Sequence, residues 1–392
     1  MDLFTKCYAP SMADQYREKG IYPYFRALET RQGPEVVMEG KRRIMLGSNN
    51  YLGLTSCPEV VEAGIKALEE FGTGCSGSRF LNGTLTLHLE LESELARFLR
   101  KEAVMTFSTG FQSNLGIISA LVGRSDYMIL DRENHASIYD GTRLSFGKML
   151  RYRHGDMADL ERCLQQVPES AGALVITDGV FSMGGDIADL PNIVRLAKQY
   201  GARVMVDDAH GLGTIGEGGR GTASFFGLEK DVDVYMGTFS KSLASLGGYM
   251  AADARVVDYV RHASRPFIFS ASIPPASCAT ALAALRHLEQ HPELPQRLSE
   301  LSEYFRTALK SRGVAIRESK TPIVPIFTYQ AERTMIVANA LYEDGVYVNT
   351  VLPPAAPADG SMLRTSLMAT HTEALLDEAA EAIRRTLEVY HE

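Results

Sequence analysis

The chain has 392 residues, 45% of them hydrophobic and 22% charged, which is enough for a large folded core and a smaller second domain. A formal net charge of −8, with lysines and arginines scattered along the chain, argues against a nucleic-acid partner. No apolar run reaches the roughly 18 residues that would span a bilayer, although contact with a membrane surface remains open. The five cysteines form no CxxC pair and the start lacks a signal-peptide pattern, so we expect a cytoplasmic protein.

The expected elements alternate between strand and helix over much of the chain. Leucines that recur every four residues predict a helix over Leu87–Leu99. Short apolar and β-branched runs predict strands at Ala103–Phe107, Tyr127–Leu130, Ala173–Thr177, Arg203–Val206, Asp233–Met236 and Gly248–Ala251. Such alternation is typical of an α/β protein, with a mostly parallel sheet covered by helices on both faces.

The pattern changes after about residue 290. A long helix expected at Pro274–Gln290 ends in a proline-rich break, and a helix–strand–helix–strand–helix series follows, closing with Thr372–Val389. We therefore expect a large domain at residues 56–290 and a small α+β C-terminal domain at 291–392. The N-terminal segment, residues 1–55, is expected to pack against the small domain.

One glycine pattern resembles a dinucleotide-binding motif but stands in the wrong context. Gly72–Gly77 reads GxGxxG, which carries meaning only between a strand and a helix. Here a segment with helical period, Val60–Phe71, precedes it, and no helical period follows at once. We expect these glycines to let the backbone pass close to a ligand or a neighbouring subunit.

A lysine and an acid follow two of the predicted strands. Lys241 ends the run Gly237-Thr238-Phe239-Ser240-Lys241, and Asp207 opens Asp207-Asp208-Ala209-His210. Singly, each is unremarkable, but the carboxyl ends of parallel strands collect catalytic groups. A lysine can hold an aldehyde cofactor as a Schiff base, and an acid beside the ring nitrogen keeps pyridoxal phosphate protonated. Together they predict a site for this cofactor.

Other residues after strands suit the same cofactor. Ser108-Thr109-Gly110-Phe111 precedes a helix whose free amides could bind a phosphate, although a plain turn explains it equally well. His135 could stack on the cofactor ring and reach a substrate carbonyl, or be a half-buried histidine beside a capping asparagine. His210 and Ser182 could each donate to the phenolic oxygen of the ring.

Arg364 is the one charged residue in the apolar run Leu363–Leu367. A buried arginine is costly unless it is paired, and a substrate carboxylate would suit it. An internal salt bridge would satisfy it equally. We expect no metal site, because the histidines and cysteines form no grouping that we identify as metal-binding.

These motifs resemble those of the α-oxoamine synthases, pyridoxal-phosphate enzymes that condense an amino acid with an acyl-CoA. The resemblance covers the chain from about residue 20 to the end and is carried by Ser48–Leu54, Asp178–Met183, Asp207–Gly211, Gly237–Lys241 and Arg364–Leu367. It implies the aspartate-aminotransferase-like fold (fold type I), with a large mostly parallel domain and a smaller α+β domain. It also implies a homodimer.

The resemblance assigns roles to individual residues. The catalytic residues would be Lys241, His135, Asp207 and His210. The cofactor would be bound by Gly110, Phe111, His135, Ser182, Asp207, His210, Thr238, Ser240 and Lys241, with Ser270 and Ala271 approaching from the partner subunit. Asn49, His135 and Arg364 would bind the substrate. Ala271 departs from the asparagine or threonine found in many relatives, which weakens the expected contact there.

The sequences of two loops, Gly72–Leu85 and Gly237–Gly248, resemble those of the family branch that condenses L-serine with palmitoyl-CoA. The implied products are 3-ketodihydrosphingosine, CoA and CO2, at the first step of sphingolipid synthesis. The alternative is a branch that uses glycine or L-alanine, of the 2-amino-3-ketobutyrate CoA ligase or 8-amino-7-oxononanoate synthase type. A catalytically dead partner subunit is disfavoured because Lys241, Asp207 and both histidines are present. An ordinary aminotransferase is disfavoured by the segments Asn49–Leu54 and Gly72–Thr84.

Overall fold

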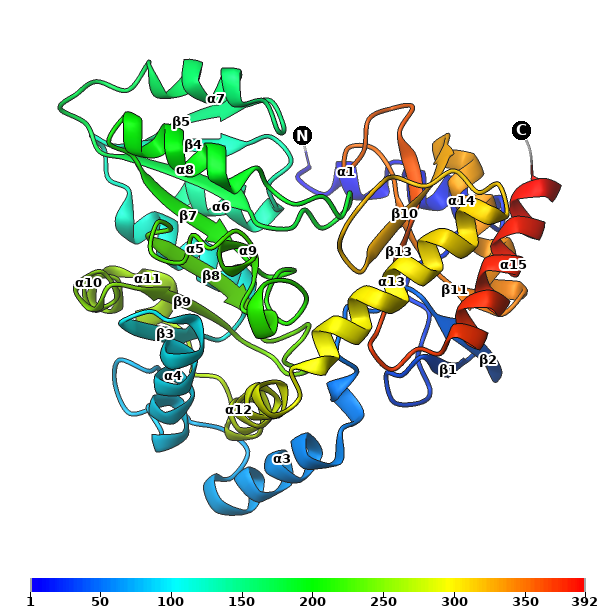
Figure 1. Ribbon diagram of the computed structural model, residues 1–392, viewed down its shortest axis with the longest axis horizontal. Helices are drawn as coiled ribbons and strands as arrows, with labels where there is room; N and C mark the ends of the chain where they lie inside the picture. Colours follow the sequence, from blue (N-terminus) through cyan, green and yellow to red (C-terminus); the bar gives the residue numbers. More distant parts are fainter. Residues whose placement is uncertain (1, 391–392) are drawn as a thin grey trace.

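The computed structural model describes residues 2–390 and consists of a large and a small domain (Figure 1). The large domain is built on a seven-stranded sheet, and the small domain on two three-stranded sheets. Helix α13 (Glu293–Ser311) runs from the large domain along the small one. No helix in the described part of the chain is long and apolar enough to cross a membrane.

The large sheet has the strand order β3-β9-β8-β7-β6-β4-β5. Neighbouring strands are parallel from β8 through β5, whereas β9 is antiparallel to both β8 and β3. Its strands are β3 (Ala103–Phe107), β4 (Tyr127–Asp131), β5 (Lys148–Tyr152), β6 (Ala173–Asp178), β7 (Arg203–Asp207), β8 (Val234–Thr238) and β9 (Gly248–Ala252). Six of the seven were expected from the sequence, within two residues at each end.

The strand missed by the sequence analysis is β5. It lies at the edge of the sheet, where only β4 pairs with it. Its sequence, Lys148-Met149-Leu150-Arg151-Tyr152, is mostly exposed and carries two charges. An edge strand needs no continuous apolar run, because one side faces solvent.

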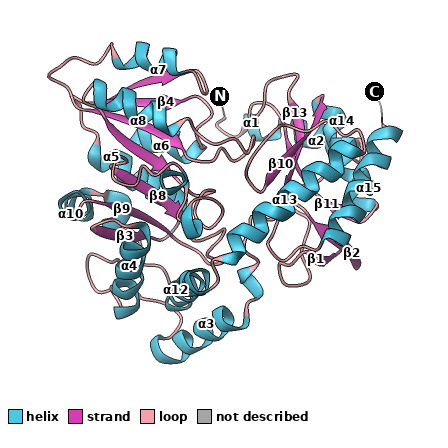
Figure 2. Ribbon diagram, viewed as in Figure 1, coloured by secondary structure: helices cyan, strands magenta, loops and turns pink. Residues whose placement is uncertain are grey.

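Helices cover both faces of the sheet, and the side chains of each strand alternate between them (Figure 2). In β4, Met128 and Leu130 face one hydrophobic core and Ile129 faces the other. The first core is completed by α5 (Gly110–Leu121), α6 (Ala136–Leu144), α10 (Ala254–Ala263) and α11 (Arg265–Ile268). The second is completed by α3 (Pro58–Phe71), α4 (Thr86–Leu99), α7 (Met157–Leu164), α8 (Leu190–Gln199) and α12 (Pro275–Gln290).

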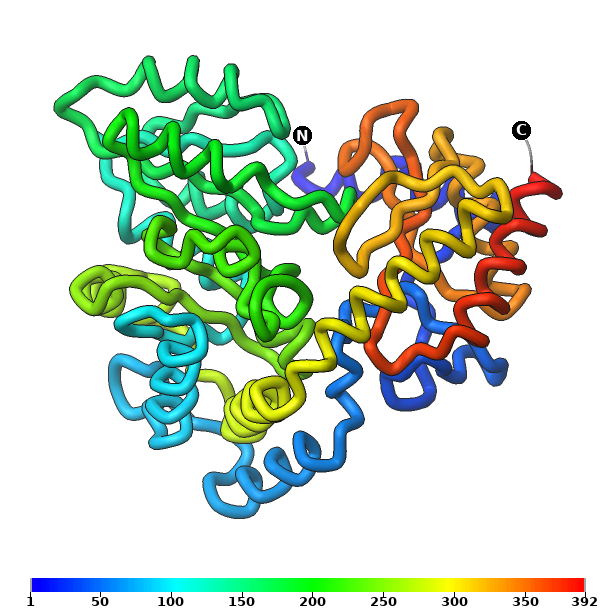
Figure 3. The backbone as a smooth tube through the Cα atoms, in the orientation of Figure 1, coloured from blue at the N-terminus to red at the C-terminus, as the bar shows by residue number. Residues whose placement is uncertain are grey.

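The small domain combines segments from the beginning and the end of the chain, coloured blue and orange to red in Figure 3. β2 (Lys41–Met45) pairs with β1 (Glu35–Met38) on one side and with β11 (Val346–Tyr347) on the other. A second sheet has the order β10-β13-β12, formed by Ile323–Tyr329, Ser361–Ser366 and Asn349–Val351. The C-terminal series therefore has three short strands between α14 (Ala331–Glu343) and α15 (Glu373–Val389), where one was expected.

The remaining elements are short. They are α1 (Thr5–Tyr8), α2 (Met12–Glu18), α9 (Thr222–Phe225) and the 3-10 turns Leu54–Ser56 and Glu217–Gly219. The GxGxxG segment lies in the loop between helices α3 and α4, with no strand before it. This agrees with the rejection of a dinucleotide site.

Candidate active site

The central pair of the site is Lys241 and His210, which follow the neighbouring strands β8 and β7. Lys241 Nζ lies 2.7 Å from His210 Nε2, and the other ring nitrogen, Nδ1, lies 2.7 Å from Tyr51 Oη. His210 is buried, with 7% of its surface exposed. The parallel sheet thus brings together at one edge the two residues that the sequence places after separate strands.

The two consecutive acids after β7 have different roles. Asp207, the last residue of the strand, lines a cavity with Lys241, and its Oδ2 accepts a hydrogen bond of 2.7 Å from Asn114 Nδ2. Asp208 instead accepts from the Thr222 amide (2.7 Å) and hydroxyl (2.6 Å). Burial raises the pKa of Asp208 to about 6. Asp207 is therefore the acid available to a ligand, whereas Asp208 holds the segment at Thr222 in place through its hydrogen bonds.

The start of α5 forms a polar cradle with the end of β8. Thr109 caps the helix by accepting from the amide of Gln112 (3.1 Å), so the next amides face the cavity. Thr238 Oγ1 lies 2.9 Å from Ser240 Oγ on the facing loop. A Cβ on Gly110 would stand 2.8 Å from Thr238, which explains why glycine is required there. Free amides and hydroxyls of this kind suit a phosphate.

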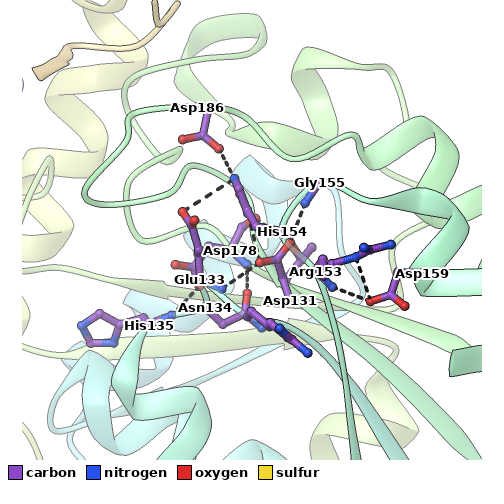
Figure 4. Close-up of polar contacts among 12 residues, drawn as sticks. Asp131, Glu133, Asn134, His135, Arg153, His154, Gly155, Asp159, Asp178 and Asp186 are labelled. Atoms are coloured by element: carbon purple, nitrogen blue, oxygen red, sulfur yellow. Dashed lines mark hydrogen bonds and ion pairs between the residues drawn. The ribbon is translucent and has the colours of Figure 1, made fainter. Parts of the chain in front are cut away.

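His135, the N-cap residue of α6, lines the same cavity as Lys241. Its Nδ1 lies 2.7 Å from Ser137 Oγ, and its ring is edge-on to Phe111 with centroids 6.4 Å apart. Figure 4 shows how the preceding turn is held. Asn134 Nδ2 donates to the carbonyl of Ile176 (2.8 Å), and the His135 amide donates to Asp178 (3.3 Å).

A second histidine, His154, ties this turn to the loop after β6 (Figure 4). Its ring nitrogens lie 3.0 Å from Asp131 Oδ1 and 2.8 Å from Asp186 Oδ2. Although burial opposes it, hydrogen bonding to both carboxylates raises the pKa of His154 to about 10. His154 is therefore a charged structural link near the site and does not line it.

Arg364, on β13, reaches the site from the small domain. Its guanidinium donates to Asn49 Oδ1 (3.0 Å), Tyr51 Oη (3.3 Å) and Ser366 Oγ (2.8 Å), and its Nε donates to the carbonyl of Ser182 (2.5 Å). The side chain is buried, and none of the described residues places a carboxylate within ion-pair distance of it. The internal salt bridge is thus excluded among these residues. A buried cation with only neutral partners is suited to bind an anion.

The electrostatics of the site favour neutral bases. Burial lowers the pKa of Lys241 to about 8 and lowers that of His210 well below its ordinary value. Burial, together with nearby Asp207, raises the pKa of Asp178. An amine with a lowered pKa is a better nucleophile and base at neutral pH.

Two adjoining cavities meet at Lys241, His210 and His135. The inner one, of about 280 Å³, contains the Asp207 carboxylate and the phosphate-type cradle. The outer one, of about 360 Å³, is lined by Asn49, Ser182 and Arg364 and by small-domain residues around 347–351. Lys241 thus lies where the chamber that contains the Asp207 carboxylate meets the chamber that contains the Arg364 guanidinium.

Most of the residues expected from the sequence line these two cavities, with three differences. Ser182 lies in the outer cavity, where its backbone carbonyl contacts Arg364. Ser270 and Ala271 do not line the cavities of their own chain. Ala271 instead accepts a hydrogen bond from Ser108 and bridges to Ser78.

Two residues of the site were not assigned a role from the sequence. Tyr51 is fully buried and contacts both His210 and Arg364. Asn114 is buried on the inner face of α5 and holds Asp207. The sequence of α5 does not single out Asn114, because Gln112, Ser113 and Ser119 are also polar; only its burial, which the fold decides, marks it as a hydrogen-bonding residue.

Comparisons with known proteins agree with this geometry. The model of the family "Aminotransferase class I and II" matches residues 41–383. The chain therefore belongs to the class I and II aminotransferase family. This confirms the fold type expected from the sequence, with a seven-stranded large domain and a smaller C-terminal domain.

Within that family the chain is similar to serine palmitoyltransferases and 8-amino-7-oxononanoate synthases. It is 51% identical to serine palmitoyltransferase of Sphingobacterium spiritivorum, over 96% of this chain and 94% of that protein. It is 47% identical to 8-amino-7-oxononanoate synthase of Geobacter sulfurreducens, over 95% of each. The structure of serine palmitoyltransferase from S. paucimobilis with a bound PLP–myriocin aldimine matches with a TM-score of 0.97, 38% identity and full coverage of both chains. The resemblance to the α-oxoamine synthases is thereby confirmed.

Proposed function

We propose that this protein is a pyridoxal-phosphate-dependent acyltransferase that condenses L-serine with a long-chain acyl-CoA, palmitoyl-CoA in the first instance. The products would be 3-ketodihydrosphingosine, CoA and CO2, at the entry to sphingolipid synthesis. One observation carries the proposal: Lys241 lies between a chamber that contains the Asp207 carboxylate and one that contains the buried Arg364, which has no carboxylate partner among the described residues. The 51% identical serine palmitoyltransferase supports the same conclusion.

The inner chamber fits pyridoxal phosphate by the chemistry of its walls. Lys241 would anchor the aldehyde, and Asp207, oriented by Asn114, would keep the pyridine nitrogen protonated. His135 would stack on the ring, and His210 would contact the phenolic oxygen. Gly110, Phe111, Thr238 and Ser240 would hold the phosphate and the ring edge. When bound, the cofactor supplies an electron sink for negative charge at the substrate α-carbon.

The protein's own groups would then orient the amino acid and move its proton. Arg364 and Asn49 would grip the carboxylate, which decides which bond at the α-carbon stands perpendicular to the cofactor ring. The Lys241 amine, with its pKa lowered by burial to about 8, would remove the α-proton and later return one. His135, which lines both chambers, would donate to the carbonyl of the incoming thioester. Carbon–carbon bond formation releases CoA, and loss of the carboxylate releases CO2.

A second candidate function is condensation with glycine or L-alanine in place of serine. The 47% identity to an 8-amino-7-oxononanoate synthase favours it. Both candidates use the same lysine, acid and arginine, so the site alone does not separate them.

The deciding experiment measures products rather than CoA release alone. The purified protein with pyridoxal phosphate is incubated with L-serine, glycine or L-alanine, each with acyl-CoAs of several chain lengths, and the aminoketones are detected by mass spectrometry. We expect the highest kcat/KM with L-serine and a C16 thioester. A higher kcat/KM with glycine or alanine would replace serine as the assigned substrate.

We further propose a homodimer as the active unit. Segments 77–83 and 269–272 lie together, since the Ser272 amide donates to Gly77 (3.0 Å) and Ser78 bridges to Ala271. Leu81 and Phe269 on these segments are each 76% exposed. A second copy would cover these apolar side chains and bring Ser270 to the neighbouring site. Sedimentation of a fully active monomer at assay concentration would contradict this.

The division into an N-terminal segment (1–55), a large domain (56–290) and a small domain (291–392) is also proposed. It is supported by the separate sheets, because β2 pairs with β11 and the large sheet uses only strands between 103 and 252. A cytoplasmic location is proposed because the cysteines, all free, suit a reducing compartment. Cell fractionation with an antibody to the protein would test it.

A further inference from the structure

A cysteine, a glutamate and a histidine meet on the surface where the chain passes between its two domains. Cys57 is the N-cap residue of α3 and follows the turn that leaves the small domain. His287 is in the last turn of α12, just before the chain turns into α13 and re-enters the small domain. Figure 1 shows α3 and α12 next to each other below the start of α13. None of these residues contacts the cavities at Lys241.

The three side chains place three different metal-ligand atoms together. Cys57 Sγ lies 2.9 Å from Glu59 Oε2 and 3.8 Å from His287 Nδ1. All three donor atoms lie within 4.8 Å of one another. A thiolate and an imidazole that share one tetrahedral zinc ion stand about 3.5 Å apart, given Zn–S near 2.3 Å and Zn–N near 2.0 Å. The Cys57–His287 distance is therefore already close to that of two ligands of one ion.

The scaffold around the cluster is rigid enough to hold this geometry. Helices α3 and α12 pack closely, since a Cβ on Gly64 would stand only 2.9 Å from Thr280. The His287 ring is backed by His291, whose centroid lies 4.3 Å away and whose Nδ1 is 2.9 Å from Glu293 Oε1. The first turn of α3 sets the backbone positions of Cys57 and Glu59.

We propose that Cys57, Glu59 and His287 form a binding site for a divalent transition metal of the zinc type, with water in the fourth position. One sulfur, one nitrogen and one carboxylate oxygen are ligand types that zinc accepts, and three protein ligands leave one position open. A metal here links α3 to α12 at the two places where the chain crosses between the domains. Its role is to stabilise the packing of α3 against α12 at this point, and it takes no part in the chemistry at Lys241.

The sequence alone predicts no metal site, although His287 and His291 are four residues apart. The decisive contact joins residues 230 positions apart. Sequence spacing within one helix does not reveal a ligand supplied by another.

The test uses the chelator-treated holoenzyme and Co2+ as a spectroscopic probe. Thiolate-bound tetrahedral Co2+ gives ligand-field bands to the red of the cofactor absorption, together with a thiolate charge-transfer band. We expect both bands to saturate at one Co2+ per chain and to disappear on addition of ZnCl2. Thermal unfolding should shift to higher temperature when ZnCl2 is added, because the ion binds the folded state.

Variants then locate the site. Cys57→Ser should remove the charge-transfer band, whereas His287→Gln should keep the thiolate and need more Co2+ to develop the band; both should weaken zinc affinity on the order of tenfold or more. Glu59→Gln changes an exposed side chain, so it should weaken binding without affecting folding. The control, Cys7→Ser, removes an exposed thiol elsewhere and should leave the titration unchanged. An unchanged charge-transfer band in Cys57→Ser, an unchanged Co2+ affinity in Glu59→Gln, or no Co2+ bands in the unaltered protein would overturn the proposal.

Discussion

Lys241 Nζ and His210 Nε2 lie 2.7 Å apart, although each follows a different strand. Burial lowers the pKa of both groups, to about 8 for the lysine and well below the ordinary value for the histidine. Because burial disfavours a protonated His210, the histidine is the neutral partner in this contact. Lys241 loses its proton more readily than a lysine in water.

The first prediction concerns cofactor binding by the apoprotein as a function of pH. Only a neutral amine attacks an aldehyde, and with a pKa of about 8 roughly a tenth of Lys241 is neutral at pH 7. We expect the rate of pyridoxal-phosphate binding, followed by absorbance, to rise with pH and level off above a midpoint near 8. Lys230→Ala, which removes an exposed lysine, should behave like the unaltered protein. A midpoint above 10 would show that burial does not lower this pKa.

The second prediction is the loss of chemistry in Lys241→Ala. The variant should bind pyridoxal phosphate without the visible band that borohydride abolishes, because no other lysine lines the inner chamber. Condensation with L-serine should slow by about a hundredfold to ten-thousandfold, the usual effect of removing a general base. A variant that keeps both the reducible band and turnover would contradict the assignment of Lys241.

The third prediction tests Arg364 as the carboxylate clamp. Arg364→Ala should raise the KM for the amino acid about tenfold to a hundredfold, since a hydrogen bond to a charged group contributes roughly 1.5–3 kcal/mol. Arg364→Lys should recover part of this loss, because the lysine keeps the positive charge. The recovery should be incomplete, because an ammonium cannot bind a carboxylate in bidentate fashion. Cofactor absorbance should be unchanged in both variants.

The measurement for Arg364 is a spectral titration with L-serine, glycine and L-alanine. Arg385→Ala, which removes a surface arginine paired with Asp344, serves as the control. If Arg364→Ala titrates like the unaltered protein, the carboxylate is held elsewhere.

The fourth prediction concerns stability and His154. Its pKa is about 10 in the folded protein and near 6.5 when unfolded, so its contribution is complete below pH 6.5 and is lost as pH rises towards 10. His154→Asn should lower the free energy of unfolding at pH 6 by about 1–3 kcal/mol, since the side chain is 21% exposed and not fully buried.

The difference between His154→Asn and the unaltered protein should shrink as the pH is raised from 6 to 10 in urea unfolding experiments. His262→Asn replaces an exposed histidine and should change stability little at any pH. A difference that stays constant with pH would mean that His154 acts through packing and not through its charge.

Much of the fold followed from local patterns. Strand β3 was expected at Ala103–Phe107, where it is found, and the alternation of strands and helices indicated the parallel sheet. The pairing of Lys241 with Asp207 in one cavity followed from the rule that parallel strands end at a common edge. Both kinds of information are short-range, since periodicity and strand ends are visible within a dozen residues.

The tertiary structure decided which partners the polar side chains have. In the sequence, Arg364 could equally have formed an internal salt bridge; the fold surrounds it with Asn49, Tyr51 and Ser366, all neutral. The contact between Arg364 and Asn49 joins residues 315 positions apart, and that between Cys57 and His287 joins residues 230 apart. No local pattern encodes such contacts, because they depend on how two domains and two helices pack. The sequence by itself determined the class of chemistry, and packing determined which charges are left free to bind a ligand.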